Sequence, residues 1–142
     1  MIYYIADNHF GHKNVIRFDN RPFADTVLMD EVLVHNWNER VTEDDTVYIL
    51  GDCFWKNEEN SVKLIQRLKG HKHLIRGNHD RVHGRLRFYY ESIEHYAEIN
   101  DNDRLVILCH YPIPFYKNQH YGAVMLYGHV HNTREQDFIE KW

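Results

Sequence analysis

The sequence predicts one α/β domain over residues 1–142, with helices outside a central sheet layer. In the first half of the chain, short segments rich in β-branched and aromatic residues alternate with segments of helical periodicity, which is typical of parallel strands. In the second half, two apolar segments flank a tight turn, which is typical of an antiparallel hairpin. The strand segments are apolar on successive residues, so we expect them to be buried on both faces.

The first half has the element order β-α-α-β-α-β. Strands are expected at residues 1–6, 46–50 and 73–76. A short segment, 13–18, precedes the first long helix. Because helices connect successive strands, the strands are expected to pair in parallel.

Two segments have the periodicity of an amphipathic helix. In residues 24–41, Met29, Leu33 and Trp37 recur at every fourth position and form one apolar stripe. In residues 58–68, apolar positions recur in the same way. Both helices should therefore pack against the sheet through one face.

The second half consists mostly of strands. Residues 93–99 and 104–109 flank the polar turn 100–103 and should form a hairpin. The last clear strand is expected at 123–127. Residues 81–90 have no clear periodicity, which indicates an irregular or briefly helical segment.

The composition excludes several classes of protein. With 43% hydrophobic and 27% charged residues and no low-complexity segment, the chain is not intrinsically disordered. Its N-terminus lacks the basic region and cleavage site of a signal peptide, and no apolar segment approaches the roughly 20 residues of a membrane helix. Two cysteines cannot form a disulfide framework. We therefore expect a cytoplasmic protein with no membrane association.

The formal net charge of −4 argues against a general nucleic-acid binder, but the charge is uneven. Residues 63–87 contain eight basic residues and one acidic residue, a local charge of +7. This basic stretch surrounds residues 78–80. It is either a solvated helix face or a local positive field for an anionic substrate.

Five predicted strands end beside residues that can bind a metal ion. We expect seven side chains to converge at one edge of the sheet: Asp7, His9, Asp52, Asn78, His110, His129 and His131. Carboxylate, imidazole and amide ligands together suit Mn²⁺, Fe²⁺ or Zn²⁺. Seven ligands are more than one tetrahedral ion uses, whereas two ions about 3.5–4 Å apart that share the Asp52 carboxylate would use them all.

Within the pairs Asp7/His9 and His129/His131, the two ligands are two residues apart. If the chain stays extended there, both side chains of a pair point to the same side. Each pair should then reach into one pocket.

The predicted centre favours phosphate chemistry. Two divalent ions, two aspartates and a metal-bridging hydroxide leave a net charge of +1, which would attract a phosphate ester and activate the hydroxide for attack. His79 directly follows a ligand and is expected to protonate the leaving oxygen or to hold a phosphate oxygen. Asp80 is expected to orient and charge that imidazole.

Four further residues lie next to these ligands in the sequence. Trp55 and Lys56 follow Asp52 closely and should line the mouth of the pocket. Cys53 and Cys109 each neighbour a ligand on a strand, so we expect both thiols to point away from the metals and to be buried.

The predicted ligands and the residues around them match a known pattern. The chain resembles the calcineurin-like metallophosphoesterases in five blocks, which span residues 1 to 131: Asp7-x-His9, Gly51-Asp52, Gly77-Asn78-His79-Asp80, His110 and Gly128-His129-x-His131. The segments His9-Phe10-Gly11-His12 and Arg21-Pro22-Phe23 resemble the small single-domain bacterial or phage branch of that family.

The resemblance implies a site and a fold. The first metal ion would be held by Asp7, His9, Asp52 and His131, the second by Asp52, Asn78, His110 and His129, with His79 as the catalytic histidine. The implied fold is a four-layer double β-sheet sandwich flanked by helices. The implied activity is hydrolysis of phosphomonoesters or phosphodiesters with Mn²⁺, Fe²⁺/Fe³⁺ or Zn²⁺, Mn²⁺ being favoured in vitro.

The chain departs from the family pattern at its end. Eleven residues follow His131, whereas family members continue through at least one more strand. We expect this strand to be missing, to be supplied by a partner chain, or to lie beyond this sequence. An uncovered sheet edge invites pairing, so a homodimer through that edge is a hypothesis.

Three functions remain open. The first is a dinuclear metal-dependent phosphoesterase that acts on a small phosphate ester or diester. The second is a nuclease or nucleic-acid end-processing phosphatase, which the basic stretch supports and the overall acidity weakens, so nucleic acid is not the favoured partner. The third is a non-catalytic metal-binding interaction module.

Overall fold

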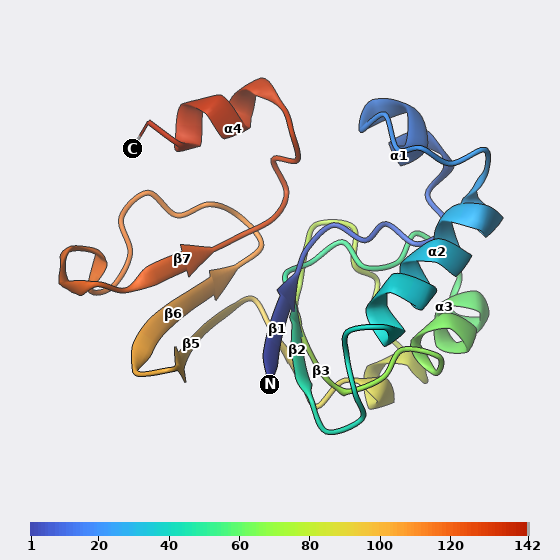
Figure 1. The fold of residues 1–142 in the computed structure, drawn as a ribbon, viewed down its shortest axis with the longest axis horizontal. Helices are drawn as coiled ribbons and strands as arrows, with labels where there is room; N and C mark the ends of the chain where they lie inside the picture. The colour runs from blue at the N-terminus through green and yellow to red at the C-terminus, as the bar shows by residue number, and fades with distance from the viewer. Residues whose placement is uncertain (142) are drawn as a thin grey trace.

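Seven strands form two sheets in the computed structural model, which describes residues 1–141 (Figure 1). The first sheet is parallel, in the order β1 (Ile2–Ile5), β2 (Thr46–Ile49), β3 (His71–Ile75) and β4 (Ser92–Glu94). The second sheet has the order β5 (Tyr96–Asp101), β6 (Arg104–Cys109) and β7 (Val124–Leu126), with β5 antiparallel and β7 parallel to β6. The predicted mixed α/β architecture is confirmed, and residue 142 of the expected domain lies outside the described residues.

Of the described helices, the two longest begin at a residue whose side chain caps them. The structure has α1 (Lys13–Phe18), α2 (Thr26–Asn38), α3 (Glu58–Ile65) and α4 (Arg134–Ile139), with short 3₁₀ helices η1 (Leu86–Tyr89) and η2 (Gln119–Tyr121). Asp25 accepts a hydrogen bond from the Leu28 N–H at 2.8 Å and caps α2. Asn57 caps α3 in the same way through the Asn60 N–H at 3.0 Å. Among the described residues, no helix combines the length and apolar composition needed to span a bilayer.

Helices α2 and α3 cover one face of the first sheet, on the right in Figure 1. Trp37 of α2 and Ile65 of α3 are buried in the same cluster as the strand residues Ile49 and Leu74. The stripe predicted for the first helix is therefore core, and the Trp37 indole N–H donates to the Lys69 carbonyl oxygen at 3.0 Å.

The opposite face of the first sheet packs against the second sheet. Leu50 and Ile75, at the ends of strands of the first sheet, form one buried cluster with Val106 and Leu108 of β6. Tyr4 of β1 joins this layer from its margin and donates from its hydroxyl to the Asp101 carboxylate at 2.9 Å. Apolar contacts therefore hold the two sheets together.

Leu108→Ala is expected to lower the free energy of unfolding by about 2–5 kcal/mol, because Leu108 is fully buried between the sheets and its truncation leaves a cavity. Denaturant unfolding of the metal-free protein measures this loss. Leu28→Ala removes the same atoms from a side chain that is 47% exposed and should cost far less. Equal losses from both substitutions would contradict this packing.

The predicted strand 93–99 is wrong in one respect, because it is two strands that belong to different sheets. An uninterrupted strand would place residues 93, 97 and 99 on one face. In the structure, Ile93 packs against the helix-side core, whereas Ala97 and Ile99 pack between the sheets. The chain therefore leaves the first sheet after Glu94 and enters the second at Tyr96, with the exposed His95 between them.

The layers are fewer than the resemblance implied. Helix α4 lies above β7 in the view of Figure 1 and buries none of its residues. Residues 1–141 thus build three layers, namely helices, first sheet and second sheet. Successive residues are buried at the centre of β6 and at the end of β3, whereas β2 alternates between half-buried and buried residues. Dimerisation through an open sheet edge stays a prediction.

Candidate metal centre

The seven predicted ligands lie in loops at the carboxyl ends of the strands. The loop after β1 runs beside the loop after β2, because Asp7 N–H donates to the Gly51 carbonyl oxygen at 3.1 Å and His9 N–H to that of Asp52 at 2.9 Å. The in-register parallel pairing of β1, β2 and β3 brings the ends of these strands to one edge. The first three ligand loops therefore meet there.

Five ligands adopt a left-handed backbone conformation. The φ angles are 53° for Asp7, 53° for His9, 52° for Asp52, 71° for His129 and 48° for His131. The expectation that both pairs sit on extended chain is therefore wrong. Within each pair, left-handed turns rather than a strand pleat direct the two side chains. Such conformations cost about 1–3 kcal/mol each and are concentrated at functional sites.

Glycines precede three of the ligands, Asp52, Asn78 and His129, because there is no room for a side chain. A Cβ atom on Gly51 would lie 2.2 Å from Nδ1 of His110, and one on Gly77 would lie 2.2 Å from Oδ1 of Asp52. The glycines thus allow three ligand loops to approach one another closely.

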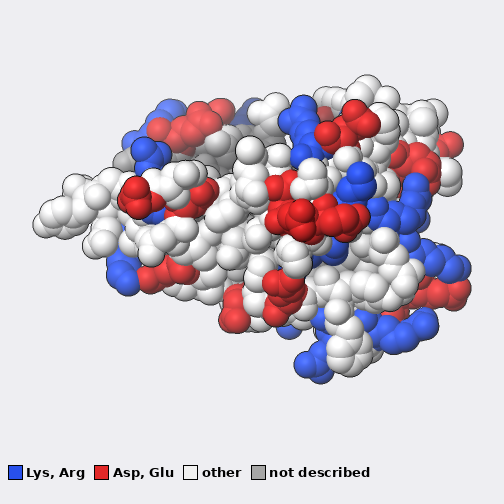
Figure 2. Space-filling model, turned by 60° about the horizontal axis from the view of Figure 1, so that its bottom comes forward, with Lys and Arg blue, Asp and Glu red and all other residues white. Residues whose placement is uncertain are grey.

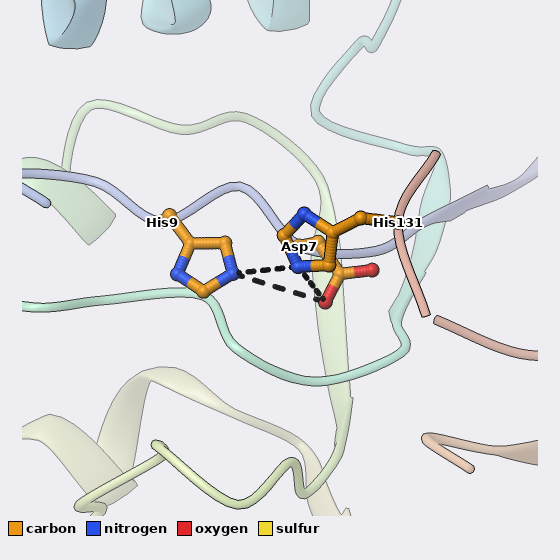
Figure 3. Close-up of side chains that lie close together, drawn as sticks. All are labelled: Asp7, His9 and His131. Atoms are coloured by element: carbon orange, nitrogen blue, oxygen red, sulfur yellow. Dashed lines mark hydrogen bonds and ion pairs between the residues drawn. The ribbon is translucent and has the colours of Figure 1, made fainter. Parts of the chain in front are cut away.

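The first group of donor atoms consists of Asp7, His9 and His131 (Figure 3). Nε2 of His131 lies 3.6 Å from Oδ1 of Asp7 and 3.2 Å from Nε2 of His9. Nε2 of His9 lies 3.9 Å from the same Asp7 oxygen. The side chains come from the two ends of the described chain and converge on one point.

The second group consists of Asp52, His110 and His129, with Asn78 beside them. The amide oxygen of Asn78 lies 3.0 Å from Nε2 of His110 and 3.1 Å from Nδ1 of His129. Nε2 of His110 lies 3.6 Å from Oδ2 of Asp52. All seven predicted ligands are thus placed in two groups.

A single carboxylate oxygen faces both groups. Oδ2 of Asp52 lies 3.6 Å from Nε2 of His110 in the second group and 3.9 Å from Nε2 of His9 in the first. The other oxygen, Oδ1, accepts a hydrogen bond from the His79 backbone N–H at 2.9 Å. Asp52 is 3% exposed, so this orientation is fixed by its surroundings.

The donor set fits cations because hydrogen-bond acceptors face one another. Nδ1 of His110 donates to the Leu50 carbonyl oxygen at 2.7 Å, which leaves Nε2 as an acceptor directed at Asp52. Nδ1 of His131 lies 2.9 Å from the Asp19 carboxylate, which leaves its Nε2 as an acceptor directed at Asp7. With Nδ1 as the donor of each neutral ring, Nε2 has no proton to share with the facing carboxylate, so a cation would satisfy both sides.

Burial keeps the imidazoles of His9 and His129 in the neutral form that binds metal ions. Desolvation lowers the pKa of His9 to about 4 and also lowers the pKa of His129, which His110 nearby lowers further. Both rings are therefore neutral at neutral pH, as metal ligation requires. Burial also raises the pKa of the Asp7 carboxyl, although the nearby His131 and His110 oppose the shift.

Asp80 has a different role from the predicted one. Its carboxylate accepts hydrogen bonds from three backbone N–H groups, those of Asp52 at 2.8 Å, Cys53 at 3.0 Å and Gly77 at 2.8 Å. The prediction that Asp80 orients the His79 imidazole is therefore wrong. The buried carboxylate instead holds together the loops that carry Asp52 and Asn78.

His79 lies at the margin of the centre and is exposed. Its ring packs against Trp55 with a centroid distance of 4.4 Å. Trp55 stacks on His12 at 3.9 Å, and Nδ1 of His12 lies 3.2 Å from Nδ1 of His9. These rings form an aromatic wall beside the metal centre.

A cavity of about 470 Å³ adjoins this wall. Trp55 and Lys56 line it, as predicted, together with Asn78 and His79. The Lys56 ammonium group lies 3.1 Å from the Asp30 carboxylate. The cavity therefore offers a polar space next to the predicted catalytic histidine.

The two cysteines differ from each other. Cys53 is fully buried in the helix-side core, as predicted, and burial raises the pKa of its thiol. Cys109 is only half-buried, so the prediction of complete burial is wrong for it.

Sequence reasoning missed Asp19 and the role of Arg21. The Asp19 carboxylate binds Nδ1 of His131 and accepts from Nη2 of Arg21 at 3.1 Å. Arg21 also donates to the carbonyl oxygens of Asp7 at 2.9 Å and Asn8 at 2.8 Å. These contacts join the first and last ligand loops. The only sequence signal was the family-like Arg21-Pro22-Phe23 segment, which does not indicate contacts.

Asp19→Asn is expected to weaken binding at the first metal site by about 10–100-fold, because the His131 ring loses its anionic partner. Calorimetric titration of the metal-free protein with Mn²⁺ measures the change. Asp44→Asn, in an exposed turn, removes the same charge and should leave the affinity unchanged. Wild-type affinity in Asp19→Asn would show that His131 is positioned without it.

Comparisons with known proteins place the chain in a family. No family model matches the sequence. The chain is 35% identical over 139 residues to "Uncharacterized protein MJ1445" of Methanocaldococcus jannaschii, an alignment that covers 96% of this chain and 73% of that protein. The chain belongs to the MJ1445 family.

The "Gene 66 protein" of Mycobacterium phage L5 is 38% identical over 85 residues, which cover 57% of this chain and 40% of that protein. The protein of the same name from phage D29 is 26% identical over 159 residues, which cover 92% of this chain and 78% of that protein.

A solved structure shares the fold. The protein of unknown function AQ665 from Aquifex aeolicus matches with a TM-score of 0.78 and 27% identity, over 100% of this chain and 85% of that one. The mixed α/β arrangement described above is therefore shared by the MJ1445-family chain and AQ665.

Proposed function

We propose that the protein is a dinuclear metal-dependent phosphoesterase of the calcineurin-like type, with the double-sheet sandwich that this type implies. One observation carries the proposal, namely that Oδ2 of Asp52 faces two separate groups of metal-binding atoms. A single-ion structural site needs no second group and no shared carboxylate. The order of the five sequence blocks supports the same assignment.

The residues of the site have three roles, namely metal ligation, positioning of the ligand loops and action on the substrate. Asp7, His9 and His131 would hold one ion, Asn78, His110 and His129 would hold the other, and Asp52 would be shared. Two divalent ions bound there would activate water as the nucleophile and stabilise the negative charge that develops on the phosphate. Asp80, Asp19 and Arg21 keep the ligand loops in place through the hydrogen bonds described above.

His79 is the group placed to act on the substrate. Its backbone N–H is fixed by Asp52 at 2.9 Å, while its side chain is exposed at the edge of the cavity. In this position the imidazole donates a proton to the leaving oxygen or a hydrogen bond to the phosphate.

The test is hydrolysis by purified protein. With Mn²⁺ it should hydrolyse bis-p-nitrophenyl phosphate or p-nitrophenyl phosphate, and EDTA should abolish the reaction. Comparison of the two compounds also measures the preference between diester and monoester. No turnover with Mn²⁺, Fe²⁺, Zn²⁺ or Ni²⁺ would contradict the proposal and favour a non-catalytic metal-binding module.

A further inference from the structure

Exposed histidine and arginine side chains recur along a segment that begins at His79, which we call the row. Every second residue from there to position 87 is histidine or arginine, and all five are exposed: His79, Arg81, His83, Arg85 and Arg87. Between them, Asp80 and Leu86 are buried and Val82 is half-buried. Gly84, also between them, is exposed. The buried residues anchor the segment in the fold, while the histidine and arginine side chains stay on the surface.

Two basic residues of the wider stretch, both outside this row, are paired with carboxylates. Lys63 pairs with Glu59 at 2.7 Å and Arg67 pairs with Glu31 at 2.6 Å. Figure 2 shows red side chains interleaved with the blue ones on the face it presents. Lys63 and Arg67 therefore fit a solvated surface, one of the two alternatives for this stretch, whereas the row is the candidate for a local positive field.

Within the row, two arginines keep their charge free. Among residues 1–141, no ion pair involves Arg81 or Arg87. Arg85 is 72% exposed and its Nε lies 3.8 Å from Glu58, a weak and solvated pair. The row thus offers free guanidinium groups to an anion.

The cavity connects the row with the metal centre. Arg81 and His83 line the cavity of about 470 Å³ on the side of the row, and Asn78 and His79 line it on the side of the centre. A ligand in this cavity would therefore touch the predicted catalytic histidine and the first arginine of the row.

Exposed aromatic rings accompany the arginines. Trp55 is 44% exposed and lines the cavity, and Phe88 is 79% exposed beyond it. Cζ of Arg87 lies 5.6 Å from the centroid of the Phe88 ring. Alternating guanidinium groups and exposed rings are the features on which single-stranded nucleic acids bind, through phosphates and stacked bases.

We propose that the substrate is a single-stranded nucleic acid held along the row from His79 to Arg87. One phosphodiester would lie at the metal centre, the adjoining nucleotide in the cavity, and further phosphates at Arg81 and Arg87, with a base against Phe88. The inference rests on the proposed phosphoesterase function and specifies its substrate. A duplex would hide its bases from Phe88, and a mononucleotide would fill the cavity without using Arg87.

The test is fluorescence anisotropy with a labelled oligothymidylate of about 12 nucleotides, in EDTA so that no strand is cut. The double variant Arg81→Ala/Arg87→Ala should weaken binding about tenfold and reduce the salt slope by about 1.4, because each lost phosphate contact to a single strand removes about 0.7. Phe88→Ala should also weaken binding, although it removes no charge.

The matched control is Lys63→Ala/Arg67→Ala, which removes the same charge from side chains that are already paired with carboxylates. It should change the dissociation constant less than about twofold. The side chains of Lys63, Arg67, Arg81 and Arg87 are all exposed. Thermal unfolding measures whether each variant is folded.

Several results would contradict the proposal that a single strand binds along the row. These are no binding by the wild type, equal weakening by both double variants, equal affinity for a duplex, or equally effective competition by a mononucleotide. The two proposals fail separately. Hydrolysis of bis-p-nitrophenyl phosphate without strand binding would contradict only the proposed nucleic-acid substrate. Strand binding without any hydrolysis would contradict the proposed phosphoesterase function.

Discussion

Asp52→Asn is expected to lower the turnover of bis-p-nitrophenyl phosphate by about 10³-fold or more and to release at least one of the two metal ions. The reason is that Oδ2 of Asp52 is the one oxygen that faces both groups of ligands. The amide has nearly the same shape but lacks the negative charge that would hold two cations together. Steady-state kinetics and the metal content of the purified variant measure both effects.

Asp44→Asn is the matched control, because it removes the same charge from an exposed turn. It should keep wild-type turnover and metal content. If Asp52→Asn also retained two ions and full activity, the carboxylate would not be shared and the two-ion arrangement would be wrong. A thermal unfolding curve separates loss of metal from loss of fold.

His79→Ala is expected to lower kcat by about 10²–10⁴-fold while two metal ions remain bound. The imidazole is exposed at the cavity, and it belongs to neither group of metal-binding atoms. Its removal should therefore affect the chemical step and not the assembly of the centre. Turnover at saturating substrate, together with metal analysis of the same sample, checks this expectation.

His35→Ala removes an exposed histidine from α2, far along the chain from the ligand loops, and should leave kcat unchanged. Two outcomes would contradict the role of His79. Unchanged kcat would favour the non-catalytic module, and loss of metal would make His79 a ligand.

Much of the centre could be predicted because its signals are local. Each ligand lies in the loop that follows a short strand, and parallel strands bring their ends to one edge. The periodicity of Met29, Leu33 and Trp37 likewise identified the helix that covers the first sheet, because burial of one helix face is visible in the spacing alone.

The remainder depends on contacts between distant residues. Asp19 contacts His131, which lies 112 residues further along the chain, and no local sequence pattern predicts that contact. Asp80 follows His79 in the sequence, which suggested a pair, but the fold turns its carboxylate toward three backbone N–H groups. The change of sheet between Glu94 and Tyr96 was hidden because no glycine or proline separates the two strands.

Backbone conformation was also beyond the sequence. Asp7, His9, Asp52, His129 and His131 all have positive φ angles, a region that glycine favours and that costs other residues energy. Composition gives no sign of this strain. The strain is retained where the metal-binding atoms converge, which supports the interpretation of this edge as the functional site.

The most direct test of the dinuclear centre is anomalous diffraction from crystals of the protein soaked in Mn²⁺. The account predicts two manganese peaks about 3.5–4 Å apart, one beside Asp7, His9 and His131 and the other beside Asn78, His110 and His129, with Asp52 between them. A single peak, or peaks away from the Asp52 carboxylate, would contradict it.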